Sequence, residues 1–144
     1  NKIEFQVIKY HPMTSFRILN SVPSLRQYAD MAVGHHKTYD GQYGYPMEFD
    51  NVHAPDKILI DIVSICDSLD AATDYLGRSY AKNKSFGQVL QELQRGSGCR
   101  YSEEIVEVIA KSEPLQKELE KLLLYDREVI CLKLYTKMKE LLRR

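Results

Sequence analysis

The sequence predicts an all-α fold, and three observations support this prediction. Apolar residues recur every three or four positions in several segments, which is the spacing of one helix face. No segment alternates apolar and polar residues as a half-buried strand does. Serine and proline stand where helices would begin, and "GSG" at 96–98 stands where a helix would end.

The N-terminal part predicts one or two helices up to residue 20, with Pro12 at or near a helix start. A further helix is expected from Ser21, a possible N-cap, with Pro23 in its first turn. Its apolar face comprises Leu25, Tyr28, Ala29, Ala32 and Val33. This helix would place the adjacent His35 and His36 at its C-terminal end.

Residues 37–54 lack an apolar period and predict a loop of roughly 18 residues, a length that is usually functional or mobile in compact domains. Residues 55–75 predict a helix that is apolar almost all round, through Ile58, Ile62, Ile65, Leu69 and Ala72, so we expect it to be buried. Polar residues on a buried helix must find partners. Those on this helix are Asp61, Asp67, Asp70 and Asp74.

The C-terminal part predicts a helix over 85–95 from Ser85 and another over about 102–111 capped by Ser102. From Pro114 to Arg144 the sequence predicts a single uninterrupted amphipathic helix, roughly 45 Å long. Its apolar stripe comprises Leu115, Leu119, Leu122, Leu123, Val129, Ile130, Leu132, Leu134, Met138, Leu141 and Leu142. The stripe would either pack across its own domain or form a homodimer or partner interface. We therefore divide the chain into residues 1–111 and an appended helix over 112–144.

Composition excludes some classes of partner. Twenty basic residues balance twenty acidic ones, so no net charge draws the chain to bulk nucleic acid or to an anionic membrane. No apolar run approaches the roughly 20 residues that span a bilayer, so no membrane segment is expected here. The cysteines, Cys66, Cys99 and Cys131, are odd in number and widely spaced, which favours a reducing cytoplasm.

Four residues are of the types that bind catalytic metals: His11, His35, His36 and Asp67. Neighbouring helical residues point about 100° apart, so His35 and His36 would serve two neighbouring ions, or one ion and one substrate contact. A structural interpretation remains open, because a helical histidine is often a cap or a core residue and a buried aspartate can bind a hydroxyl or a helix end.

The segment "HHKTYDGQYGYP" at 35–46 resembles the HD-GYP family signature HHExxDGxGYP. Three further segments resemble that family in the same order. They are its His-Pro helix, its Asp-x-x-Asp-Ala helix and its Gly-x-x-Phe-Asp-Pro segment, here "EFQVIKYHPMTSFRIL", "SICDSLDAATDYLGRSYAK" and "GSGCRYSEEIVEVI". The resemblance covers about residues 3–110, and it identifies the chain as a divergent C-terminal part of an HD-GYP-like domain.

The resemblance implies a bundle that binds one to three ions of iron or manganese and hydrolyses a phosphodiester bond in cyclic di-GMP or a related cyclic dinucleotide. The implied metal ligands are His11, His35, His36 and Asp67. Arg78 and Lys82 would grip phosphate and guanine, and Tyr45 would line the substrate pocket. The signature loop residues are Asp40, Gly41, Gly44 and Pro46.

The chain also departs from the family pattern. The family's His-Asp pair would lie upstream of residue 3, so we expect a longer parent protein and a weak or inactive isolated fragment. Lys37 replaces the glutamate of HHE, which places a cation near the metal ligands unless it points outward. Two residues, Gln42 and Tyr43, stand where the family has one. His53 matches no family ligand, and we expect it at the surface.

In the final family segment, "CRYSEE" keeps an aromatic residue at Tyr101 and a helix cap at Ser102, so this change is interpreted as structural. Two other functions are compatible with the sequence. One is a catalytically degenerate module that binds a nucleotide or a protein partner in signalling. The other is a phosphohydrolase of the same fold that acts on a different nucleotide.

Overall fold

The computed structural model describes residues 2–75 and 83–142, and this part of the chain contains helices and no β-strand. The all-α prediction is therefore confirmed. In chain order the elements are α1 (Lys2–Ile8), α2 (His11–Ser21), the 3₁₀ turn η1 (Arg26–Tyr28), α3 (Ala29–Gly34), α4 (Lys57–Thr73), α5 (Phe86–Arg95), α6 (Glu103–Lys111), α7 (Glu113–Lys121), the π turn η2 (Leu122–Asp126) and α8 (Arg127–Leu142). None of the described helices is long and apolar enough to cross a bilayer.

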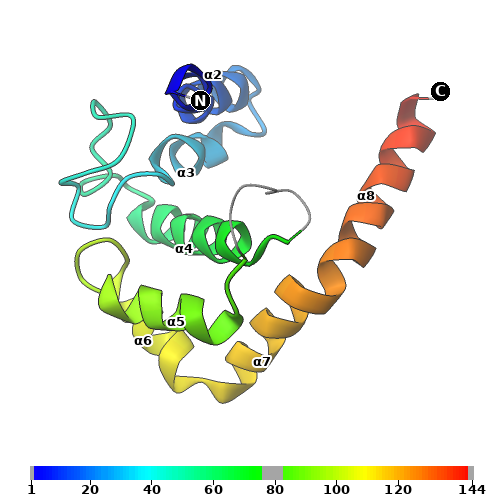
Figure 1. Cartoon of the computed structure of the whole chain (residues 1–144). Coiled ribbons are helices and arrows are strands. Elements are labelled where there is room, and N and C mark those ends of the chain that lie inside the picture. Colours follow the sequence, from blue (N-terminus) through cyan, green and yellow to red (C-terminus); the bar gives the residue numbers. More distant parts are fainter. Residues whose placement is uncertain (1, 76–82, 143–144) are drawn as a thin grey trace.

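Helix α4 is the centre of the fold (Figure 1). Helix α3 packs on one side of it and carries α2, whereas α5 packs on the other side and is followed by α6 and α7. The main core lies between α4, α5 and α6, and its buried residues are Ile65, Leu69, Phe86, Val89, Leu93, Tyr101, Val106 and Ile109. Because α3 packs against both α2 and α4, it brings residues that are far apart in sequence close together.

The prediction that α4 is buried all round is wrong for one of its faces. Ile60, Ile65 and Leu69 are buried, but Ile58 and Ile62 remain 47% and 41% exposed. The physical reason is coverage, since α3 and α5 pack on only part of the circumference of α4. Sequence hydrophobicity indicates which residues favour burial, and it does not indicate which elements are present to cover them.

The predicted helix start at Ser21 is also wrong, because Ser21 is the last residue of α2 and α3 begins at Ala29. Val22 is extended, with φ −107° and ψ 112°. A residue that precedes proline is disfavoured in the helical region, so Pro23 ends α2 rather than starting a new helix. Ala29 and Val33 are buried as expected, whereas Leu25 and Tyr28 are exposed.

The two helix starts in the C-terminal part are confirmed. Ser85 and Gln88 form a reciprocal capping box at the start of α5. Ser102 accepts a hydrogen bond from the Ile105 amide at the start of α6. Both caps are local in sequence, which explains why the sequence located them.

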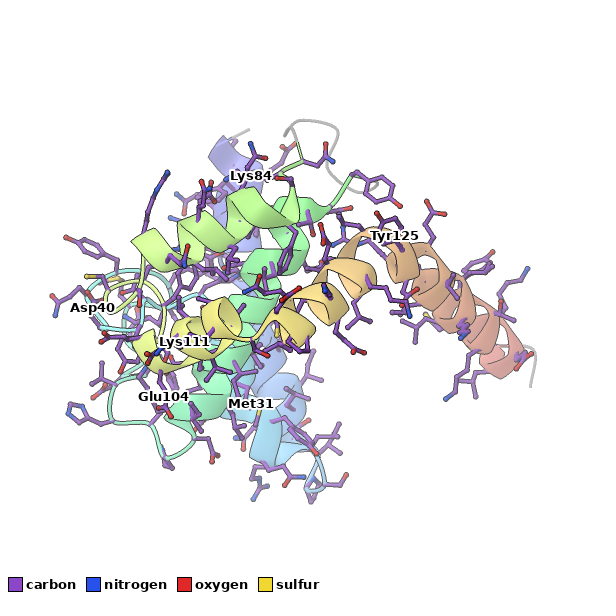
Figure 2. The ribbon with its side chains drawn as sticks, turned by 90° about the horizontal axis from the view of Figure 1, so that it is seen from below. Met31, Asp40, Lys84, Glu104, Lys111 and Tyr125 are labelled. Atoms are coloured by element: carbon purple, nitrogen blue, oxygen red, sulfur yellow. The ribbon has the colours of Figure 1, made fainter. Side chains whose placement is uncertain are left out.

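Residues 113–142 are helical throughout, but the predicted uninterrupted α-helix contains the π turn η2 at Leu122–Asp126. The first half packs on its own domain, since Leu115, Leu119 and Leu123 contact the core. From Glu128 to Leu142 every side chain is exposed, and Figure 2 shows α8 extending beyond Tyr125 away from the other helices. The homodimer or partner interface for this segment stays a prediction.

The four aspartates predicted on helix α4 each lie near a basic side chain. Asp61 is buried and pairs with Lys57 one turn earlier. Burial raises the pKa of Asp61, although the Lys57 ammonium opposes that shift. Asp70 and Asp74 pair with Arg127 at the start of α8. Asp67 faces the histidines described next, so α4 connects the long C-terminal helix to the candidate site.

Candidate functional site

His11 and His35 face each other in an arrangement that favours a cation bound between them. The Nδ1 atom of His11 lies 2.6 Å from the Ile8 carbonyl oxygen, and Nδ1 of His35 lies 2.8 Å from that of Ala32. A carbonyl oxygen only accepts, so each Nδ1 carries the proton, and in a neutral imidazole Nε2 is then left with a lone pair. The two Nε2 atoms are 3.1 Å apart. Two lone pairs at this distance need a proton or a metal ion to join them.

His36 completes a cluster of three histidines. One ring nitrogen from each of His11, His35 and His36 lies within 4.8 Å of the other two. Nitrogen ligands at about 2.1 Å from one cation are themselves about 3 to 4 Å apart, so small side-chain rotations would let all three bind one ion.

The expectation that the adjacent histidines point apart is therefore wrong. Helix α3 ends at Gly34, and His35 and His36 lie in the turn that follows it. His35 still has helical dihedrals, φ −62° and ψ −17°, but the 100° separation describes only the Cβ directions, and the side-chain rotamers can bring the two rings together. As a result, the ring centroids of His35 and His36 are only 4.1 Å apart.

Asp67 brings a carboxylate from α4 to the cluster, with Oδ2 3.8 Å from Nδ1 of His36. Burial, and after it the neighbouring His35, lower the pKa of the His36 imidazole to about 4, whereas Asp67 opposes the shift. Burial also lowers the pKa of His35. Both imidazoles are therefore neutral at pH 7, which is the form that binds metals.

The loop after His36 folds back onto that residue. Gly44 has φ +99°, and a Cβ at this position would lie 2.1 Å from the His36 carbonyl oxygen, so only glycine fits. The amide of Tyr45 donates to the same carbonyl oxygen at 3.3 Å. The Tyr45 ring consequently lies against the His36 ring, with 4.7 Å between the centroids.

The turn that precedes Gly44 is held by Asp40. The carboxylate of Asp40 accepts hydrogen bonds from the Thr38 hydroxyl at 2.6 Å and from the Gln42 amide at 3.0 Å. These hydrogen bonds lower the pKa of Asp40. Gly41 has φ +73°, and the peptide between Tyr45 and Pro46 is cis.

The two departures within this loop point away from the histidines. The extra residue is accommodated at the tip of the loop, where Gln42 is exposed and Tyr43 is 73% exposed. Lys37 is buried, and it lines a separate hollow of about 420 Å³ formed with loop residues 40–42 and 47–53. The Lys37 side chain thus lies outside the cavity that the histidines share.

That cavity has a volume of about 570 Å³, which is in the range of small-molecule sites. His11, His36 and Asp67 line it together with the aromatic residues Phe5, Tyr45 and Tyr101. The remaining polar lining comprises Ser68, Asp74, Asn83, Lys84, Glu92 and Arg100. The cavity therefore combines candidate metal ligands with flat apolar surfaces and cations, the groups that a nucleotide requires.

A sequence profile described as HD domain matches residues 1–105. The chain belongs to the HD domain family. Within 118 residues it is 36% identical to a protein of Thermotoga maritima named cyclic di-GMP phosphodiesterase, which covers 81% of this chain and 30% of that protein. The chain thus spans less than a third of the relative's length. No solved structure matches the chain.

The HD domain match ends within α6, so α7, η2 and α8 lie outside it. Inside the matched region, the structure brings together His11, His35, His36, Asp67 and Tyr45. Arg78 and Lys82 lie outside the described residues. His53 is at the surface as expected, where its Nδ1 is 2.8 Å from Asp50 Oδ2.

Sequence reasoning missed Lys84, Glu92 and Arg100 as cavity residues. Lys84 and Glu92 form an ion pair across the start of α5, and nothing in their local sequence sets them apart from ordinary surface charges. Arg100 falls in "CRYSEE", which was interpreted as a structural segment. The only available signal was its position beside Tyr101, an aromatic residue that replaces the family's phenylalanine.

Proposed function

We propose that this HD domain is of the HD-GYP type and contributes the metal ligands and substrate cavity of a phosphodiesterase for cyclic di-GMP or a related cyclic dinucleotide. The observation that carries the proposal is the 3.1 Å distance between the Nε2 atoms of His11 and His35, each of which has a lone pair. The 36% identity to a protein named cyclic di-GMP phosphodiesterase supports this substrate class. The signature loop that packs on His36 supports the HD-GYP subtype.

In this proposal His11, His35, His36 and Asp67 hold a divalent cation, iron or manganese as the HD-GYP resemblance implies. Neutral imidazoles together with a carboxylate suit such ions. When bound, a divalent cation polarises the phosphoryl group and lowers the pKa of water. The carbonyl groups of Ile8 and Ala32 fix the tautomers of His11 and His35, which leaves their Nε2 lone pairs free to bind a cation.

The same cavity would bind the nucleotide. The Tyr45 ring, held beside His36 by the Gly44 turn, offers a face on which a guanine can stack. Arg78 and Lys82 are proposed as further substrate contacts from the family resemblance. We assign this role to residues 1–111 and treat 112–144 as an appended helix.

The test is metal content by elemental analysis of anaerobically purified protein, together with cyclic di-GMP hydrolysis. Wild type should carry iron or manganese near stoichiometry and hydrolyse at most weakly, as expected for a fragment, and His36→Ala should lose most of the metal and any such hydrolysis. His53→Ala is the matched control, because His53 is an exposed histidine that pairs with Asp50 outside the cluster. Equal metal content in all three proteins would refute the ligand assignment. Retained metal and nucleotide binding without turnover would instead support the non-enzymatic alternative.

A further inference from the structure

Arg100 has a backbone position fixed directly against the signature loop. Its amide donates to the Gly96 carbonyl oxygen at 2.8 Å, within the turn between α5 and α6. Its own carbonyl oxygen accepts from the Tyr39 amide at 3.0 Å, and that of Cys99 accepts from the Asp40 amide at the same distance. The segment that carries Arg100 and the loop that carries Tyr45 are thus held together by backbone hydrogen bonds.

Arg100 lines the shared cavity and is exposed to solvent. Its guanidinium carbon lies 5.1 Å from the centroid of the Tyr101 ring, which is buried and supports it. Arg100 lines the cavity with His11, His36 and Asp67.

Among the lining residues that the structure describes, Arg100 is also the cation that is available for a ligand. Lys84, the other cation among the described lining residues, is neutralised by Glu92, whose two carboxylate oxygens both lie 2.7 Å from its ammonium. Within residues 2–75 and 83–142, no carboxylate forms an ion pair with Arg100. A planar guanidinium without a carboxylate partner matches the oxygens of a phosphodiester in a bidentate arrangement.

A cyclic dinucleotide has two phosphodiester groups in one ring, each with a negative charge. When one of them lies at the cluster of His11, His35, His36 and Asp67, the other must lie in the same cavity and needs a positive partner. We propose that Arg100 binds this second phosphodiester, the one that is not being cleaved. This inference rests on the proposed function and adds to it a residue that selects cyclic dinucleotides over substrates with a single phosphodiester.

The experiment measures cyclic di-GMP binding by isothermal titration to metal-loaded wild type, Arg100→Gln, Arg100→Lys and Arg95→Gln. Loss of one charge-assisted contact should weaken binding by Arg100→Gln about ten- to a hundredfold. The affinity of Arg100→Lys should lie between those of Arg100→Gln and wild type, because lysine keeps the positive charge but lacks the planar guanidinium that binds phosphate through two hydrogen bonds. Arg95 is the matched control, since it is an exposed arginine in the last turn of α5 that does not line the cavity.

A second substrate identifies the phosphate that Arg100 contacts. Bis(p-nitrophenyl) phosphate has only one phosphodiester. The factor by which Arg100→Gln raises the KM for this substrate should therefore be at least ten times smaller than the factor by which it raises the Kd for cyclic di-GMP. Equal losses for both ligands would place Arg100 at the cleaved phosphate or in the fold and would overturn the inference. Wild-type affinity for cyclic di-GMP in Arg100→Gln would overturn it while leaving the proposed function standing. Absence of cyclic di-GMP binding by wild type would overturn the proposed function and this inference together.

Discussion

The Arg127 guanidinium lies 2.8 Å from the Asp70 carboxylate and joins the start of α8 to the C-terminal end of α4. The same Nη2 atom donates to the Asp70 carbonyl oxygen and to the Thr73 hydroxyl. Nη1 lies 3.2 Å from Asp74, close enough for charge attraction although the geometry is not that of a hydrogen bond. Because α4 also carries Asp67, this contact bears on the candidate site.

Replacing Arg127 by methionine should lower the free energy of unfolding by about 1 to 3 kcal/mol, because it removes a buried cation and leaves two aspartates with reduced compensation. Urea denaturation followed by circular dichroism measures this change. Lys133→Met is the control, since Lys133 is an exposed cation on the same helix and its loss should change stability by less than about 0.5 kcal/mol. Equal stability of the two variants would show that Arg127 does not anchor α8 to α4.

Gly44 is the position at which the signature loop tolerates no side chain. Gly44→Ala should lower the free energy of unfolding by about 1 to 3 kcal/mol and reduce metal content, because its Cβ would meet the His36 carbonyl oxygen at a left-handed φ. Gly87→Ala is the opposite case, since a Cβ there meets nothing within 4 Å and the residue lies inside α5. This variant should gain about 0.5 to 1 kcal/mol. Thermal melts and elemental analysis of both variants check the prediction.

Much of the fold was predictable because its signals are local. Ser85 and Ser102 cap helices within three residues of themselves, and the sequence located both. The break at Pro23 was misplaced, although the rule that disfavours helix before proline was available. The exposure of Ile58 and Ile62 depends on which elements cover α4, and no pattern within α4 contains that information.

The sequence allowed us to predict which residues form the candidate site, but not how they are arranged in space. The family resemblance singled out His11, His35 and His36, whereas their convergence depends on a turn after Gly34 and on the carbonyl groups of Ile8 and Ala32. The sequence contains only a weak indication that Arg127 is buried. Arg127 follows Leu115, Leu119 and Leu123 at the same four-residue spacing, so it places a charge on the apolar face of the helix. Its partner Asp70 lies 57 residues away, so the ion pair had no local signature.

The stability of the metal-free protein should decrease as the pH falls from about 6.5 to about 4. The pKa of His36 is near 6.5 in an unfolded chain and about 4 in the folded protein, so between these values unfolding takes up a proton. The loss should be on the order of 1–3 kcal/mol across this window.

Urea denaturation of chelator-treated protein at pH 7, 6 and 5 measures this effect, and His36→Ala shows which part belongs to His36. The raised pKa of Asp61 acts in the opposite direction, since a protonated Asp61 favours the folded state as the pH falls. Both proteins contain Asp61, so its contribution cancels in the difference between them. Identical pH profiles for wild type and His36→Ala would contradict the prediction.

Tyr45 should act on the nucleotide through its ring rather than its hydroxyl, because the ring packs on His36 and lines the cavity beside Phe5 and Tyr101. Tyr45→Ala should weaken cyclic di-GMP binding about tenfold, the effect of losing one aromatic surface under a base. Tyr45→Phe keeps that surface and should stay within about twofold of wild type. Titration of both variants at equal metal content measures the difference. If phenylalanine and alanine weaken binding equally, the hydroxyl contacts the nucleotide and the stacking role of Tyr45 is wrong.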